Sequence, residues 1–171
     1  MSVPDITWQE NYEAHWNYVD FQGKTILDLG ADYGSTATWF VRKGARKIIA
    51  VEGDPKSFSQ LERNYAGDDR VIVIQLWIDS SKQIEALLEE HQPDLVKVDI
   101  EGAERTLLDV PFETLRRVPL YLVETHSQEL EAQILDLFAR LGYDGKTCIT
   151  LARDIKVHRF AASNEAGENA D

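Results

Sequence analysis

Two pairs of polar side chains stand at the ends of apolar segments, and in each pair the residues are two apart. Asp99 and Glu101 follow one apolar run. Glu124 and His126 close the next one. Side chains two apart point to the same side of an extended chain, so each pair can face a common site. Histidine titrates near neutral pH, which makes His126 the most economical general base, with Asp99 orienting it or binding a substrate. These four residues are the predicted catalytic groups.

Other roles are open to the same groups. Carboxylates that cluster can raise one another's pKa, which would make one of them a usable base. Hard oxygen ligands also suit a divalent cation such as magnesium. The donors available for a cation are Glu101, Glu104, Glu124 and His126. Nothing in their spacing demands a metal, so we predict none.

The alternative to a catalytic role for these acids is a purely structural one. Lys97 falls inside an apolar strand, and a buried lysine needs a carboxylate partner. Asp99, Glu101 or Glu124 can serve only to pair with it. Glu104 can serve only to favour the positive end of the helix that follows.

The turn after the first apolar run reads DLGADYG, from Asp28 to Gly34. A dinucleotide-binding turn would read G-x-G-x-x-G, because the backbone must approach a pyrophosphate closely. Here Asp28 ends the strand and Asp32 takes the place of a second glycine, and both carboxylates would repel a pyrophosphate. S-adenosylmethionine (SAM) has no phosphate and carries an ammonium and a sulfonium. Its carboxylate can meet free N–H groups where a helix begins near Ser35.

The next two strand ends complete a predicted cofactor site. Glu52 lies about 20 residues beyond the glycine turn, where an acid commonly binds ribose hydroxyls. Ile78 can pack on an adenine ring, and Asp79 can either meet its amino group or cap the next helix. The residues predicted to bind SAM are Asp28, Gly30, Ala31, Asp32, Gly34, Ser35, Glu52, Gly53, Ile78, Asp79 and Asp99.

Strand-like and helical segments alternate along the chain. The expected strands are apolar on both faces and cover residues 24–29, 47–52, 71–76, 94–100 and 119–124. Amphipathic helices are expected at 82–91 and 128–142, and β segments at 147–151 and 155–160. This order indicates an α/β fold with a mostly parallel sheet covered on both faces. Right-handed crossovers bring all the strand ends named above to one edge of that sheet, where ligands bind.

Three regions are expected. Residues 1–22 carry helix-spaced aromatic residues that pack on the core or form a lid over a ligand. Residues 23–160 form the cofactor-binding domain. Residues 161–171 have no periodicity and read as a disordered tail. The aromatic residues of the first region are Trp8, Tyr12, Trp16, Tyr18 and Phe21.

The amino-acid composition limits the classes of substrate and partner that the protein is expected to bind. The 171 residues include 18 basic and 30 acidic ones, a net charge of −12, which disfavours a nucleic-acid substrate. No apolar run is long enough for a membrane span, and the first residues do not read as a signal peptide. The single cysteine, Cys148, fits a reducing cytoplasm. We therefore expect a cytoplasmic protein with a small-molecule substrate, for which a homo-oligomer is possible.

The motifs together resemble the FkbM-type family of SAM-dependent methyltransferases. The resemblance covers residues 22–160, and its most distinctive string, K-x-D-x-E-G-x-E, runs here from Lys97 to Glu104. It implies the Rossmann-like class I methyltransferase fold, with seven strands of which the last is antiparallel, and SAM as cofactor. It also implies methyl transfer to a hydroxyl of a small molecule or sugar. This chain departs from the family at Asp32, where asparagine is usual, and in its short length.

Three other functions compete with this reading. The short chain is compatible with a SAM-binding module that lacks independent catalysis or needs a partner. An RNA methyltransferase has the acidic composition against it. A dehydrogenase is the least favoured, because Asp28 and Asp32 disfavour a pyrophosphate.

Overall fold

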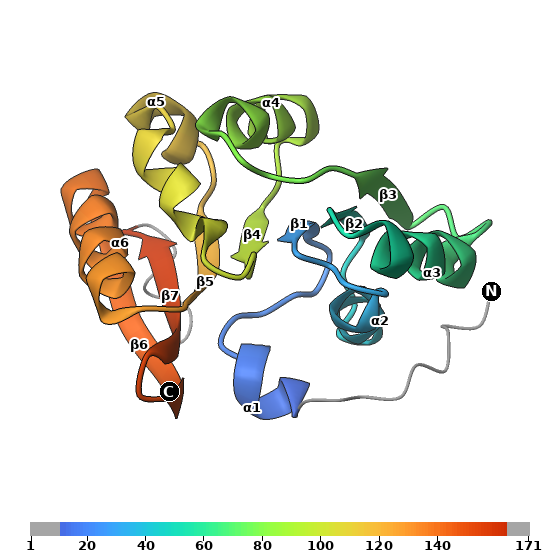
Figure 1. The fold of residues 1–171 in the computed structure, drawn as a ribbon, viewed down its shortest axis with the longest axis horizontal. Helices are drawn as coiled ribbons and strands as arrows, with labels where there is room; N and C mark the ends of the chain where they lie inside the picture. The colour runs from blue at the N-terminus through green and yellow to red at the C-terminus, as the bar shows by residue number, and fades with distance from the viewer. Residues whose placement is uncertain (1–10, 164–171) are drawn as a thin grey trace.

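A computed structural model describes residues 11–163 and shows one seven-stranded sheet (Figure 1). The strand order is β3-β2-β1-β4-β5-β7-β6. Strands β1 to β5 are parallel, and β7 runs antiparallel to both β5 and β6. The predicted α/β fold is thereby confirmed, including the antiparallel last strand. The strands are β1 Thr25–Leu29, β2 Lys47–Glu52, β3 Val71–Gln75, β4 Leu95–Val98, β5 Leu120–Thr125, β6 Tyr143–Ala152 and β7 Ile155–Ala162.

Helices cover both faces of the sheet. On one face lie α4, η1, α5 and α6, and on the other lie α1, α2 and α3 (Figure 1). The helices are α1 Tyr12–Trp16, α2 Ser35–Arg42, α3 Pro55–Tyr65, α4 Ser81–His91, the 3-10 helix η1 Ala103–Asp109, α5 Phe112–Leu115 and α6 Gln128–Leu141. Within residues 11–163, no helix is long and apolar enough to cross a bilayer.

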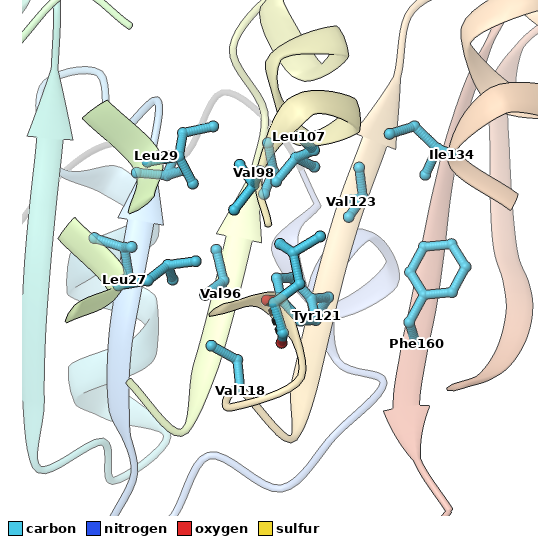
Figure 2. Close-up of a cluster of buried hydrophobic side chains, with 14 of the residues drawn as sticks. Leu27, Leu29, Val96, Val98, Leu107, Val118, Tyr121, Val123, Ile134 and Phe160 are labelled. Atoms are coloured by element: carbon cyan, nitrogen blue, oxygen red, sulfur yellow. Dashed lines mark hydrogen bonds between the residues drawn. The ribbon is translucent and has the colours of Figure 1, made fainter. Parts of the chain in front are cut away.

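The central strands supply two separate cores, because successive side chains point to opposite faces. Leu27 and Val98 belong to the core under α4 and α6, which Figure 2 shows together with Tyr121 and Phe160. Each such buried side chain contributes roughly 1.5–3 kcal/mol of transfer free energy. Alternate positions point to the face of α1 and α2. Two of those positions hold charged residues, which bear directly on the site.

Several boundaries differ from the predicted ones. Strand β3 stops at Gln75 on the edge of the sheet, so its middle residues are only partly buried. Strand β7 continues to Ala162, two residues into the predicted tail, because Ala161 and Ala162 pair with β5 and β6. The rest of the predicted tail lies outside the described residues, as do residues 1–10 with Trp8.

Candidate active site

A cavity of about 330 Å³ opens at the carboxyl ends of β1, β2, β3 and β4, within the roughly 300–1,000 Å³ usual for small-molecule sites. Eight of the residues predicted to bind a cofactor line it. They are Gly30, Ala31, Asp32, Ser35, Glu52, Gly53, Ile78 and Asp99. We call this the first cavity. Leu76, Trp77 and Ile78, which follow β3, also line it, so the cavity gathers four strand ends that are far apart in the sequence, as the sheet-edge argument predicted.

The turn after β1 fits so closely against β4 that it admits no side chain at Gly30. This glycine has φ 82°, and a Cβ there would lie 1.7 Å from the carbonyl oxygen of Asp99. Asp32 adopts φ 48°, in the left-handed region that aspartate and asparagine enter more readily than most residues. The turn therefore presents bare backbone to the first cavity.

Glu52 ties the turn to the end of β2. One oxygen of its carboxylate accepts from the backbone N–H of Asp32 at 2.8 Å, and the other accepts from the N–H of Asp54 at 2.7 Å. Each carboxylate oxygen keeps a further lone pair for a ligand. Glu52 is thus held in place on the cavity wall, in the position predicted for a ribose-binding acid.

The prediction that Asp28 contacts the cofactor directly needs correction. Its side chain is fully buried and does not line the first cavity. Oδ2 accepts from the Thr36 hydroxyl at 2.5 Å, and Oδ1 lies 3.1 Å from the Lys97 ammonium. The reason is strand parity, because Asp28 and Lys97 are neighbours in the β1–β4 register and point to the same face.

Lys97 connects β4 to the glycine turn. Its ammonium donates to the carbonyl of Gly30 at 2.7 Å and also lies 3.5 Å from Asp99. Burial opposes its charge, but the carboxylates of Asp28 and Asp99 outweigh burial and raise the pKa of the lysine. The expected need for an acidic partner is confirmed for Asp99. The nearer partner, Asp28, was not among those considered.

Two other predicted cofactor residues lie outside the lining of the first cavity. Gly34 instead packs against Tyr65, where a Cβ would lie 2.4 Å from the ring. Asp79 is exposed, and the helix cap is formed by Ser80 rather than by Asp79. Trp77 was missed. It is 70% exposed, lines the cavity and lies over Gly53, where a Cβ would be 2.7 Å from the indole.

The predicted catalytic residues converge around His126. Its Nε2 lies 3.8 Å from Asp99, 3.6 Å from Glu101 and 3.5 Å from Glu124. Its Nδ1 lies 3.0 Å from Oε1 of Glu104. That hydrogen bond, with the nearby carboxylates, outweighs partial burial and raises the pKa of His126 to about 9. At neutral pH the imidazole therefore carries a proton, and its neutral form becomes abundant only in alkaline solution.

Glu104 connects His126 to the turn that follows β4. Its side chain is fully buried, and Oε1 also accepts from the backbone N–H groups of Ile100 and Gly102 at 3.1 Å each. Those bonds shape the turn in which Glu101 has φ 54°. As a structural alternative, the sequence analysis allowed Glu104 only a role at the positive end of the following helix. Its contacts depend on the 3-10 geometry of η1, which no spacing rule indicated.

A second cavity, of about 500 Å³, lies between α1, the end of β5 and the β6–β7 hairpin. Its polar lining includes Glu101, Glu124 and His126, and Glu101 also lines the first cavity. Its apolar lining comes from Ala14 of α1 and from the hairpin residues Ile149, Leu151, Ala152 and Ile155. The two cavities therefore meet at the predicted catalytic residues.

The helix α1 forms walls of both cavities. His15 lies 2.7 Å from Glu124 in a buried pair and lines the second cavity. Tyr12 donates to the Ser35 hydroxyl at 2.8 Å and lines the first cavity. The sequence analysis named the aromatic spacing but did not identify these contacts. The spacing of Tyr12 and His15, three apart on one helix face, was the available signal.

Known proteins are similar in sequence to parts of this chain. No protein-family model matches the sequence, so the FkbM-type assignment remains a prediction. Uncharacterized protein 158B of Sulfolobus islandicus rod-shaped virus 1 is 30% identical over 119 residues, which are 70% of each chain. The ribosomal protein L11 methyltransferase of an Enterobacter strain is 32% identical over 82 residues. That match covers 48% of this chain but only 25% of the enzyme.

Solved structures share the fold. A Streptococcus agalactiae protein of the NADB-Rossmann superfamily aligns with a TM-score of 0.68 and 15% identity, over 92% of this chain and 70% of that one. Aeropyrum pernix fibrillarin, which has SAM natively bound, aligns with a TM-score of 0.61 and 18% identity, over 82% and 67%. Methanococcus jannaschii fibrillarin, a pre-rRNA processing protein, gives 0.62 and 14%, over 84% and 69%.

The structural neighbours share the class I methyltransferase fold, and the SAM bound in one of them, with the partial match to the L11 enzyme, is the basis on which we propose SAM as the cofactor. They do not support the expectation that nucleic acid is an unlikely substrate, because a pre-rRNA processing protein is among the structural neighbours. The acceptor is not given by any of them. The chain has the class I methyltransferase fold and belongs to the same family as protein 158B of the rod-shaped virus.

Proposed function

We propose that this protein transfers the methyl group of SAM to a hydroxyl of a small molecule or sugar, as its resemblance to the FkbM-type family implies. The observation that carries the proposal is the meeting of two cavities at Glu101, beside Asp99 and His126. One cavity has the lining for a nucleoside with an amino acid portion. The other lies where an acceptor could reach the first.

The lining of the first cavity fits SAM. The close contact at Gly30 leaves backbone in place of a side chain, so the turn can approach the amino acid portion. Glu52 has carboxylate lone pairs for ribose hydroxyls, and Ile78 and Trp77 offer apolar surface to a purine. Asp79 remains our proposed partner of the adenine amino group. SAM, when bound, supplies a methyl group on a sulfonium, which acidic surroundings favour.

The residues between the cavities would handle the acceptor and its proton. Asp99 lines the first cavity and lies 3.8 Å from His126, so it can orient either the imidazole or the acceptor hydroxyl. His126 in its neutral form would accept the proton of that hydroxyl. Glu124 is fixed by His15 and holds the second cavity's polar end in shape. Because His15 lies on α1, we propose that this helix encloses the acceptor on one side of the second cavity.

The lining of the second cavity argues for the class of acceptor. Its lining includes the carboxylates Glu101 and Glu124 and the imidazoles His15 and His126, with no lysine or arginine among the described lining residues. A phosphate-bearing acceptor would meet repulsion there. Five apolar side chains line the same space. A neutral, partly apolar hydroxyl compound therefore fits better than an anionic polymer.

A partner-dependent module is the second candidate. The chain spans only a quarter of the L11 methyltransferase that it matches, so those relatives contain much that this chain does not share. If acceptor recognition lies in a partner, the protein would bind SAM yet show no turnover alone.

Thermal unfolding with SAM, S-adenosylhomocysteine and NAD, each at high concentration, tests the cofactor. A ligand present at a hundred times its Kd adds about 2.7 kcal/mol of stability. We expect both sulfur nucleosides to raise Tm and NAD to leave it unchanged. Transfer of labelled methyl from SAM to hydroxyl compounds then tests the reaction. SAM binding without turnover on any acceptor would favour the partner-dependent module.

A further inference from the structure

We propose that Asp99, Glu101 and His126 bind one divalent transition-metal ion between the two cavities. Mn²⁺ is the representative ion of this class. One ligand atom from each residue lies within 4.8 Å of the others. Asp99 and Glu101 follow β4, and His126 follows the neighbouring β5, so the sheet brings the three together. One imidazole nitrogen and two carboxylates suit manganese or a similar ion, since carboxylates favour manganese and imidazole favours the later metals.

The orientation of His126 is the first argument. Nδ1 is 3.0 Å from the Glu104 carboxylate, so the ring is held from behind. Nε2 then faces three carboxylate oxygens at 3.5, 3.6 and 3.8 Å, which are too distant for hydrogen bonds. A histidine that ligates a metal commonly donates its other ring nitrogen to a carboxylate. The observed arrangement leaves Nε2 surrounded by oxygen ligands that a cation could draw together.

The second argument is a buried atom without a partner. The side chain of Glu104 is fully buried, and its Oε2 accepts no hydrogen bond from any described residue. A buried carboxylate is costly unless its charge is compensated. A divalent ion on Nε2 of His126 would replace the second proton of the ring, keep Nδ1 as a donor to Oε1 of Glu104 and supply that compensation.

The balance of charge gives the third argument. Four carboxylates lie around His126, namely those of Asp99, Glu101, Glu104 and Glu124. Lys97, whose ammonium lies 3.5 Å from Asp99, is shared with Asp28 at 3.1 Å. Glu124 is paired with His15 through its other oxygen. The cluster therefore has more negative than positive groups even when His126 is protonated, and a divalent ion that replaces the proton on Nε2 would balance more of this excess.

The position of the ion gives it a use. Because Glu101 and His126 also line the second cavity, open coordination positions would face the space proposed for the acceptor. A metal there would orient an acceptor hydroxyl and stabilise its oxygen. Because Nε2 of His126 would then be a ligand and no longer the base, the hydroxyl proton would pass to the neighbouring carboxylate of Glu124, which also lines the second cavity. This catalytic use rests on the proposed function, whereas the binding of the ion does not.

Titration of chelator-treated protein with Mn²⁺ alone, without SAM, tests the binding. Electron paramagnetic resonance of free Mn²⁺ would count the bound ions. We expect one saturable site per chain, and Glu101→Gln should weaken it at least about 10-fold. Glu101 is 88% exposed, so this substitution leaves the fold intact. Glu90→Gln, whose side chain is 75% exposed on α4, is the matched control and should bind as the wild type does.

A second variant tests the role of Glu104. Glu104→Gln removes the charge behind Nδ1 and should also weaken Mn²⁺ about 10-fold or more. Absence of a saturable site in the wild type, or equal affinity in wild type and Glu101→Gln, would overturn the proposal. Thermal unfolding of the metal-free protein with SAM keeps the two ideas separate. Stabilisation by SAM without Mn²⁺ binding would contradict the metal site and leave the proposed function standing. Mn²⁺ binding without stabilisation by SAM would contradict the proposed function and leave the metal site standing.

Discussion

The two halves of the site are built differently. On the cofactor side, Glu52, Asp32 and Gly30 are fixed by backbone hydrogen bonds of 2.7–2.8 Å and by a contact that excludes a Cβ. On the acceptor side, His126 faces carboxylates at 3.5–3.8 Å, and Glu101 is almost fully exposed. The first half is held in a single geometry. The second has the spacing of groups that respond to protons, ions and substrate.

The comparison teaches where stability and where chemistry reside. Strands β1, β2 and β4 hold the cofactor half through their mutual register. The acceptor half is formed by turns after β4 and β5 and by α1, which are joined by side-chain contacts. Changes in the cofactor half should therefore affect folding and binding. Changes in the acceptor half should affect the reaction and its pH dependence.

Lys97→Met should have the largest effect on the free energy of unfolding. It leaves the fully buried Asp28 without its cation, and breaking a buried pair in this way costs about 3–5 kcal/mol. Denaturant unfolding measures the loss. Adding Asp28→Asn should recover much of it, because the remaining buried charge is removed. A small loss in the single variant would mean that the pair does not hold the two strands together.

Gly30→Ala should rank next, with a loss of about 3 kcal/mol from the contact with Asp99 and the positive φ together. Gly67→Ala is the matched control, because Gly67 has φ 81° but nothing within 4 Å of an added Cβ. It should lose only about 1–2 kcal/mol. Equal losses in the two variants would show that the turn can move away from β4.

Glu52→Gln should weaken SAM binding by about 1–3 kcal/mol while changing stability less. The amide keeps the shape but offers one acceptor oxygen fewer for two backbone N–H groups and a ribose. Calorimetric titration measures the affinity. Glu62→Gln, on the exposed side of α3, should bind SAM as the wild type does. Unchanged affinity in Glu52→Gln would place the ribose elsewhere.

His126 should give the acceptor half a pH dependence. Its folded pKa of about 9 lies above the ordinary 6.5, so the proton stabilises the fold below about pH 6.5. That stabilisation is lost as the pH rises through about 9. Methyl transfer should instead increase over the same range, because the neutral imidazole is the base. Both trends, measured in metal-free protein, should be absent in His126→Gln, and a flat profile in the wild type would exclude this base.

The sequence was sufficient for the fold and for which residues meet at the sheet edge. Apolar runs alternating with helices are local signals, and parallel strands must end at one edge, so Asp99 and Glu52 could be placed in advance. Side-chain pairs between residues far apart in the chain could not be predicted from the sequence. His15 and Glu124 are 109 residues apart, and only packing of α1 against β5 brings them together.

Register and local geometry account for the remaining differences. Whether Asp28 faces the cavity or Lys97 depends on which face of β1 it occupies, and an acid at a strand end fits either case. Trp77 is exposed, so no periodicity marked it as part of a cavity wall. Glu104 acquires its role from the turn at residues 100–102, which forms only when η1 begins there.

The most direct test is a crystal structure of the protein with S-adenosylhomocysteine bound. The account predicts the ligand in the first cavity, with its ribose hydroxyls on the Glu52 carboxylate and its amino acid portion at the turn from Gly30 to Ser35. Its sulfur should point toward Asp99 and the second cavity. A ligand bound outside the first cavity, or with its sulfur directed away from Asp99, would contradict the proposal that the two cavities form one methyl-transfer site.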